Sequence, residues 1–173
     1  DLGVNRNLTL WINCFLTGRK QFVRFKDTLS STITINTGAP QGCILSPVLF
    51  TLYTSDFQIR SENCFIVKYA DDTVIVGLVN RSSEFSDTKN YMGEIDNFSD
   101  WCGQNYLNLN VKKTKELIVD FGRIVSKKAP VVINDEDVEK VHQYKYLGMI
   151  IDDKLHGSLN VNRVYKKASQ RLF

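Results

Sequence analysis

The segment FIVKYADDTVIVG, residues 65–77, decides the fold prediction. Residues with high β propensity flank two adjacent aspartates, Asp71 and Asp72. This pattern predicts a β-hairpin over about 64–79, with a two-residue turn and the aspartates at the bend. Two adjacent like charges repel each other, so we expect something positive to lie beside them. A solvated surface turn is an equally weighted alternative, because Asp is common in turns.

Composition and charge predict one globular domain. The chain has 173 residues, of which 43% are hydrophobic and 24% charged. The net charge is +3, but residues 112–128 carry +4 (six basic, two acidic) and residues 66–111 carry −4 (three basic, seven acidic). Residues 161–173 add four basic groups and no acidic ones. An acidic centre between basic stretches suits a metal site beside a polyanion, and ordinary surface charge is the alternative.

Cysteine spacing and hydropathy disfavour a zinc-binding protein and a membrane protein. None of the four cysteines forms a CxxC pair, which disfavours zinc. The sequence has no signal peptide and no apolar run long enough to cross a bilayer, so we expect no membrane partner and an intracellular location, either nucleus or cytoplasm. The chain begins without Met and ends inside a helical pattern, so we expect both ends to be cut from a longer protein.

The remaining periodicities predict a mixed α+β fold with antiparallel hairpins. Helices are expected over 6–17, after Pro47, over 84–105 and over 159–173. Strands are expected over 20–25 and 31–37, which turn near 27–30, and over 116–121, 130–134 and 144–151.

A second informative stretch is GAPQGCILSPVLF, residues 38–50. Its Gly-Ala-Pro-Gln-Gly loop leads into a helix, and small residues with free backbone N–H groups let a ligand approach the main chain closely. Gln41 lies among residues of little bulk, so its amide can reach outward. A plain connecting loop is the alternative.

Together these stretches resemble the reverse transcriptase domain of LINE-type (non-LTR) retrotransposons. GAPQGCILSPVLF matches motif B of that family, YADD matches motif C, LNLNVKKTKELIVDF (107–121) resembles motif D and YKYLGMII (144–151) resembles motif E. GRKQFVRF (18–25) resembles the strand that leads into motif B. The resemblance implies a polymerase palm-like antiparallel sheet with packed helices, truncated at both ends, over residues 1–158. Residues 159–173 would begin the thumb.

This resemblance implies an RNA-directed DNA polymerase that uses two Mg²⁺ ions, with Mn²⁺ as a substitute, to join a primer 3′-hydroxyl to a deoxynucleoside triphosphate. Its partners would be an RNA template and a DNA primer. Asp71 would be the more direct metal ligand, with Asp72 assisting. Tyr69 would lie near the primer end, and the nucleotide and template side would be lined by Pro40, Gln41 and Gly42.

The resemblance assigns further roles to residues in the second half of the chain. Lys113 would donate a proton to the leaving pyrophosphate, although Lys112 leaves that register open by one residue. The alternative is a solvated basic face. Tyr146, Leu147 and Gly148 would form the primer grip, or else an ordinary buried strand. Phosphate contacts are expected from Arg19, Arg163, Lys166, Lys167 and Arg171.

One required group is not found in this sequence. The family needs a third carboxylate, the aspartate of motif A, and its place falls before Asp1. The fingers, most of the thumb and any endonuclease domain of the same polyprotein are also absent, so we expect this fragment to be inactive alone. The strand of motif A would pair beside the hairpin, so without it a sheet edge is expected to stay open. A nucleic-acid-binding retroelement relic without catalysis is the alternative.

A third class of protein is disfavoured. The segment from about 101 onward also resembles a region associated with AlkB-type, iron-dependent tRNA-modifying proteins. Such an oxygenase needs two histidines and a carboxylate around iron. The chain has only His142 and His156, and neither begins a His-x-Asp.

Overall fold

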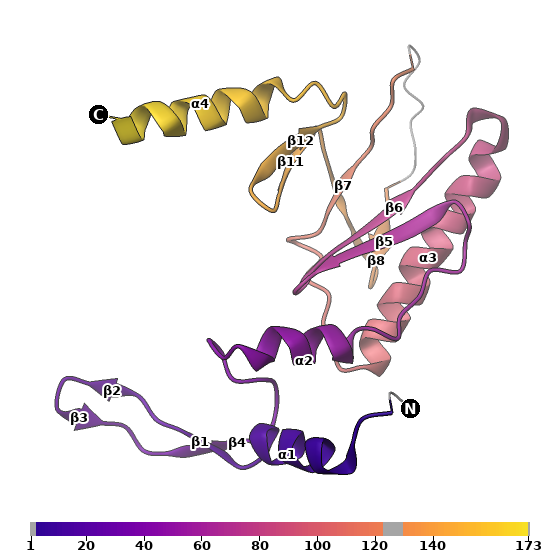
Figure 1. Cartoon of the computed structure of the whole chain (residues 1–173). Helices are drawn as coiled ribbons and strands as arrows, with labels where there is room; N and C mark the ends of the chain where they lie inside the picture. Colours follow the sequence, from indigo (N-terminus) through magenta and orange to yellow (C-terminus); the bar gives the residue numbers. More distant parts are fainter. Residues whose placement is uncertain (1–2, 123–129, 173) are drawn as a thin grey trace. The chain divides into compact units, whose positions relative to one another are not determined.

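The computed structural model describes residues 3–122 and 130–172, and the chain forms two compact units (Figure 1). Unit 1 contains residues 1–58 and 66–74, and unit 2 contains residues 59–65 and 75–173. Positions 123–128 of the predicted basic run lie outside the described residues. Helices are separated by runs of short strands, which confirms the α+β class.

Unit 1 begins with helix α1 (Arg6–Leu16) and a long two-stranded ribbon. The Asn5 side chain caps α1 by accepting a hydrogen bond from the Asn7 N–H, and the helix ends just before Gly18, as predicted. In the ribbon, β1 (Arg19–Gln21) pairs with β4 (Ile33–Ile35), and β2 (Arg24–Phe25) pairs with β3 (Thr28–Leu29), both antiparallel. Helix α2 (Leu45–Tyr53) follows and already includes Pro47 in its first turn.

The predicted hairpin is confirmed, with a correction at its turn. Strand β5 (Cys64–Tyr69) pairs with β6 (Asp72–Gly77), and the two turn residues are Ala70 and Asp71. The expectation that both aspartates lie at the bend was therefore wrong by one residue, because Asp72 already begins the second strand. Ala70 takes up the left-handed backbone conformation that the turn needs, with φ +52°.

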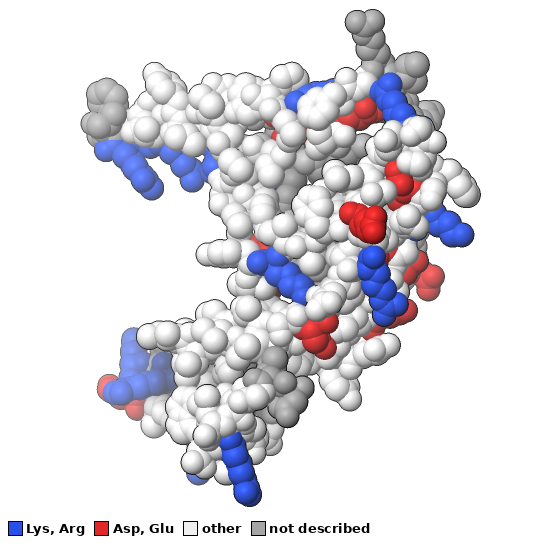
Figure 2. Space-filling model, turned by 45° about the vertical axis from the view of Figure 1, so that its right-hand side comes forward, with Lys and Arg blue, Asp and Glu red and all other residues white. Residues whose placement is uncertain are grey.

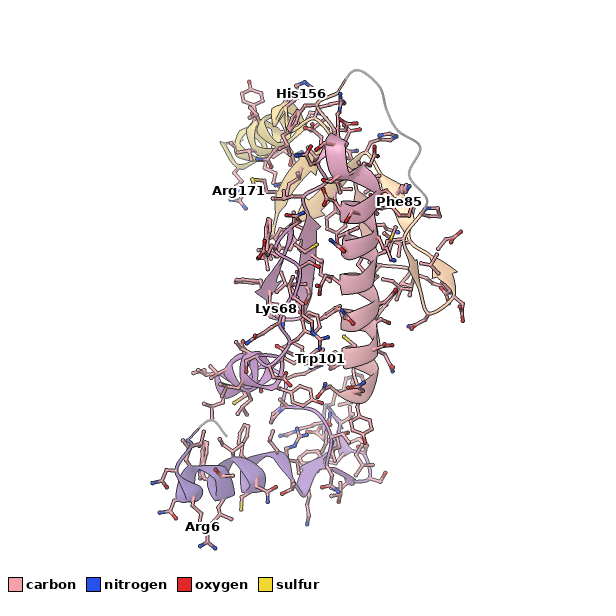
Figure 3. The ribbon with its side chains drawn as sticks, turned by 90° about the vertical axis from the view of Figure 1, so that its right-hand side faces the viewer. Arg6, Lys68, Phe85, Trp101, His156 and Arg171 are labelled. Atoms are coloured by element: carbon pink, nitrogen blue, oxygen red, sulfur yellow. The ribbon has the colours of Figure 1, made fainter. Side chains whose placement is uncertain are left out.

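Unit 2 is built on helix α3 (Glu84–Gln104), which follows the short 3₁₀ helix η1 (Arg81–Ser83). Its Ile95 packs with Val131, Ile133 and Val138 in a small buried core, to which Tyr91 adds a partly buried ring. Figure 3 shows the side chains along α3, with Phe85 near its beginning and Trp101 near its end. Unit 2 ends in helix α4 (Ser158–Leu172).

The other strands of unit 2 are short and differ from the prediction. Strand β7 (Lys115–Leu117) pairs in parallel with β10 (Glu139–Val141), and β8 (Val132–Ile133) pairs with β9 (Glu136–Asp137). The single strand expected over 144–151 is instead a hairpin of β11 (Gln143–Tyr146) and β12 (Met149–Asp152). Its turn residues, Leu147 and Gly148, both have positive φ, at +45° and +87°, which a continuous strand does not allow.

The palm-like antiparallel sheet is not confirmed by the described residues. They form six two-stranded pairs, of which β7–β10 is parallel. None of the helices in residues 3–122 and 130–172 combines the length and apolar character that a membrane span requires.

Candidate active site

The candidate active site is centred on the turn between β5 and β6. Asp71 and Asp72 are both exposed, and Tyr69 is 62% exposed beside them. Only Ala70 of the two turn residues has a positive φ, which is the sign pattern of a type II′ turn. Among the described residues, no hydrogen bond or ion pair engages either carboxylate. Their oxygens are therefore available to a cation, which would also offset their mutual repulsion.

Lys68 fastens this hairpin to the end of α2 within unit 1. Its ammonium donates a hydrogen bond to the backbone carbonyl of Thr54, a buried residue at the helix C-terminus, where a cation is favoured by the helix dipole. The same ammonium lies 5.5 Å from the centre of the Phe57 ring. Beside this contact is a depression of about 270 Å³, lined by Thr51, Thr54, Ser55, Phe57, Ile66, Lys68 and Ala70. The turn and the motif B helix are thus held together by a residue that the sequence analysis did not single out (Figure 3).

The GAPQG loop has a defined backbone at both of its glycines. Gly38 and Gly42 have φ values of +65° and +75°, the left-handed region that favours glycine. A Cβ at either position would meet nothing within 4 Å, so backbone conformation, not space, requires glycine there. Gln41 and Gly42 are exposed, whereas Pro40 is half-buried and its carbonyl accepts a hydrogen bond from the Ser46 hydroxyl. The loop therefore presents Gln41 outward, as the sequence predicted.

Arg19 supports the entry to this loop. Its Nε donates to the Leu16 carbonyl at 3.0 Å, and its Nη2 donates to the carbonyls of Thr37 and Gly38, each at 2.6 Å. Three donor contacts within the protein occupy much of this guanidinium. The phosphate contact expected for Arg19 stays a prediction, which these internal bonds do not support.

Two acidic side chains of α3 hold the base of the hairpin in unit 2. Asp87, which is buried, accepts hydrogen bonds from the Ser83 hydroxyl, the Asn80 N–H and the Asn63 amide. These bonds, with that of Ser83 the largest cause, lower the pKa of Asp87. Glu94 accepts hydrogen bonds from the backbone N–H groups of residues 60 and 61, at 3.1 and 2.8 Å.

The buried thiol of Cys64 lies in the same part of unit 2. Burial, followed by the charges of Glu94 and Asp87, raises the pKa of Cys64.

Lys113 lies in a turn of unit 2 and is exposed. Its backbone N–H donates to the Asn110 carbonyl at 3.0 Å and to the Asn110 side chain at 3.1 Å. Lys112 is also exposed, whereas Lys115 forms a 2.6 Å ion pair with Glu139. Lys112 and Lys113 therefore both remain candidates for the motif D lysine, while Lys115 has a structural role.

The predicted primer grip occupies the β11–β12 hairpin of unit 2. Leu147 is 52% exposed at the turn, and the Tyr146 hydroxyl is buried without a hydrogen-bond partner among the described residues. The Arg163 guanidinium of α4 donates to the Gly148 carbonyl, and its Nη2 lies 3.3 Å from the Asn160 side-chain oxygen. Arg163 thus ties α4 to this turn. The exposed cations of α4 are Lys166, Lys167 and Arg171, and blue side chains line one side of this helix in Figure 2.

The predicted site residues divide between the two units. Unit 1 contains Asp71, Asp72 and Tyr69 together with Pro40, Gln41 and Gly42. Unit 2 contains Lys113 and the 146–148 turn. Within residues 3–122 and 130–172, no group of three or more His, Cys, Asp or Glu side chains is arranged to hold a metal ion.

Comparison with known proteins identifies the class. Residues 2–151 match the family described as reverse transcriptase (RNA-dependent DNA polymerase), and the chain belongs to that family. The chain is 28% identical over 164 residues to the RNA-directed DNA polymerase from mobile element jockey of Drosophila melanogaster, covering 91% of this chain and 18% of that protein.

Other relatives agree with this result. The jockey polymerase of Drosophila funebris is 29% identical over 152 residues, covering 83% of this chain and 16% of that protein. The probable RNA-directed DNA polymerase from transposon BS of Drosophila melanogaster is 23% identical over 170 residues, covering 92% of this chain and 18% of that protein. The chain thus spans less than a fifth of the length of these relatives, and no solved structure matches it. The resemblance to the reverse transcriptase domain of LINE-type elements is confirmed.

Proposed function

We propose that this chain forms the palm of an RNA-directed DNA polymerase that copies an RNA template onto a DNA primer by two-metal nucleotidyl transfer. The observation that carries the proposal is the β5–β6 hairpin, where Asp71 in the turn and Asp72 at the start of β6 are both exposed in a chain that belongs to the reverse transcriptase family. The acceptor-only oxygens of these carboxylates, the helix that Lys68 ties to the hairpin and a glycine-rich loop of the same unit support this chemistry.

Residues of unit 1 would bind the metal ions, the nucleotide and the primer end. Asp71 would hold the metal ions most directly, with Asp72 assisting. Bound Mg²⁺, or Mn²⁺ in its place, would stabilise the charge that develops on the attacking and leaving oxygens. Gln41, with Pro40 and Gly42, would position the nucleotide against the template, and Tyr69 would contact the primer end.

Unit 2 would supply the remaining groups. Lys113, or Lys112 beside it, would give a proton to the pyrophosphate oxygen as that group departs. Tyr146, Leu147 and Gly148 would orient the primer, with the turn held by Arg163. The exposed cations of α4 would contact backbone phosphates as the first part of the thumb.

The third carboxylate, the motif A aspartate, would come from a part of the longer protein that precedes this sequence. Residues 1–173 alone are therefore expected not to extend a primer. Robust extension by this chain would contradict that expectation. If the longer gene encodes no such aspartate, a non-catalytic nucleic-acid-binding role replaces the polymerase.

Metal binding by the hairpin can be measured on this chain. Titration with Mn²⁺, followed by electron paramagnetic resonance, should reveal binding that Asp71→Asn weakens at least tenfold. The matched control is Asp56→Asn, an exposed aspartate of the same unit outside the hairpin. Equal Mn²⁺ binding by the two variants would exclude the hairpin as the metal site.

A further inference from the structure

The ribbon of unit 1 is exposed along its entire length. Every residue from Lys20 to Thr34 is exposed, although β1–β4 and β2–β3 pair in register. An isolated two-stranded ribbon is only marginally stable in water, and both of its edges carry unpaired backbone groups. Exposed apolar side chains grouped on such an element are typical of an interaction surface.

The apolar side chains of the ribbon include two aromatic rings. Phe22 is 52% exposed and Phe25 is 72% exposed, and further exposed apolar residues are Val23, Leu29 and Ile33. Phe25 lies beside the turn, with the Lys26 ammonium 5.6 Å from its ring centre. Lys26 has a positive φ of +53°, a conformation that costs a non-glycine residue free energy. The turn thus holds an aromatic ring and a cation together at the end of the ribbon.

The net charge of the ribbon indicates an anionic partner. Residues 19–35 contain four basic side chains and one acidic side chain, a net +3. Arg19 is bonded to backbone carbonyls of the loop, and the Arg24 Nε donates to the Lys26 carbonyl at 3.2 Å, while Lys20, Arg24 and Lys26 all remain exposed. Blue side chains gather at this end of unit 1 in Figure 2. Two copies of the ribbon would repel each other, whereas an anionic partner would be attracted.

We infer that this ribbon is a second nucleic-acid-binding element, in which Lys20, Arg24 and Lys26 contact phosphates and Phe25 stacks on an unpaired base. Single strands offer both phosphates and base faces, and aromatic rings bind them with little sequence preference. The inference rests on the proposed function only in that the ligand is a nucleic acid. The ribbon lies outside the GAPQG loop and the aspartate turn, so its role would be to hold template or primer away from the reacting atoms.

The experiment uses residues 1–173 and fluorescence anisotropy with labelled 20-nucleotide RNA and DNA strands of the same sequence, at several salt concentrations. The variant Lys20→Ala/Arg24→Ala/Lys26→Ala should weaken binding and reduce the salt slope by about 2, because each phosphate contact on a single strand contributes about 0.7. Phe25→Ala should weaken binding roughly 5- to 150-fold and leave the slope unchanged.

Two controls separate this result from general effects. Arg6→Ala/Arg60→Ala/Lys89→Ala removes the same charge from exposed cations outside the ribbon and should reduce the slope less. Phe25→Leu keeps apolar bulk and removes the ring, so it should weaken binding as Phe25→Ala does even if the latter loosens the ribbon. Thermal melting followed by circular dichroism checks that each variant is folded.

Several outcomes would overturn the inference. Ribbon variants that bind both strands like the unmodified chain would exclude it, as would an equal loss in the control triple variant. Unchanged binding by Phe25→Ala beside weakened binding by the triple lysine and arginine variant would refute stacking. Binding is scored without polymerisation, so failure of the proposed polymerase activity is a separate result. Loss of affinity for RNA, DNA or both single strands supports the inference and tells which strand the ribbon holds.

Discussion

The C-terminus of α3 offers a stability prediction that depends on one backbone angle. Tyr106 follows the helix with φ +54°, and its side chain is 94% exposed. The Leu107 N–H donates to the Cys102 carbonyl at 2.8 Å and the Tyr106 N–H donates to the Gly103 carbonyl at 3.2 Å. These two bonds define a Schellman motif, in which the left-handed residue is usually glycine.

Replacing Tyr106 by glycine should therefore stabilise the protein. Left-handed backbone costs a non-glycine residue about 1–2 kcal/mol, and glycine loses about 0.5–1 kcal/mol through its greater freedom in the unfolded chain. The exposed ring contributes almost no packing, so the net gain is about 0.5–1 kcal/mol. At about 2–4 °C per kcal/mol for a domain of this size, Tm should rise by about 1–4 °C.

Urea unfolding and thermal melting measure this effect. Tyr106→Ala removes the ring and keeps the strained angle, so its stability should equal that of the unmodified chain. Asn105→Gly places glycine one residue earlier, where φ is −101°, and should lower stability. A lower unfolding midpoint for Tyr106→Gly would refute the reasoning, because it would show that the ring packs on the protein.

Three further predictions concern the base of the hairpin. The pKa of Asp87 is lowered, so the stability that this carboxylate contributes is complete above the unfolded-state pKa and is lost as the pH falls through the folded-state pKa. Asp87→Asn should therefore flatten the acid side of a plot of urea midpoint against pH. Burial raises the pKa of Tyr91 to about 12, from an ordinary 10, so the stability that the neutral phenol contributes should be present below pH 10 and lost as the pH rises through 12. Tyr91→Phe should remove this alkaline loss of stability. Ionisation of all tyrosines near pH 10 in an ultraviolet titration would contradict the prediction. Gly77→Ala would place a Cβ 2.5 Å from a ring carbon of Tyr91 and should cost about 1–3 kcal/mol in urea unfolding, whereas an unchanged midpoint would show that the ring moves freely.

Local patterns in the sequence predicted the positions of the main elements. The apolar periodicity of 84–105 and 6–17 matches α3 and α1 within one residue, and α1 begins at a local capping signal, the Asn5 side chain. The alternation around Asp71 likewise predicted β5 and β6. The turn itself differed by one residue because Ala70, a residue that rarely adopts positive φ, takes the left-handed position.

Other features depend on contacts that no local pattern reports. The dipeptide Leu147–Gly148 was interpreted as strand interior, yet it forms a turn with two positive φ angles, in which leucine is unusual at the first position. Arg19 and Arg163 were expected to contact phosphates, whereas each donates to backbone carbonyls of a turn or loop distant in sequence. A basic residue has the same sequence signal in both roles, so only the structure separates them.

Primer extension by a longer protein that contains this chain tests the central proposal most directly. With an RNA template, a DNA primer and Mg²⁺, Asp71→Asn should lower the extension rate at least about 100-fold, since the ligand to the catalytic metal is lost, while Asp56→Asn should extend at the unmodified rate. Extension by Asp71→Asn at the same rate as Asp56→Asn would contradict the assignment of the β5–β6 turn as the catalytic metal site.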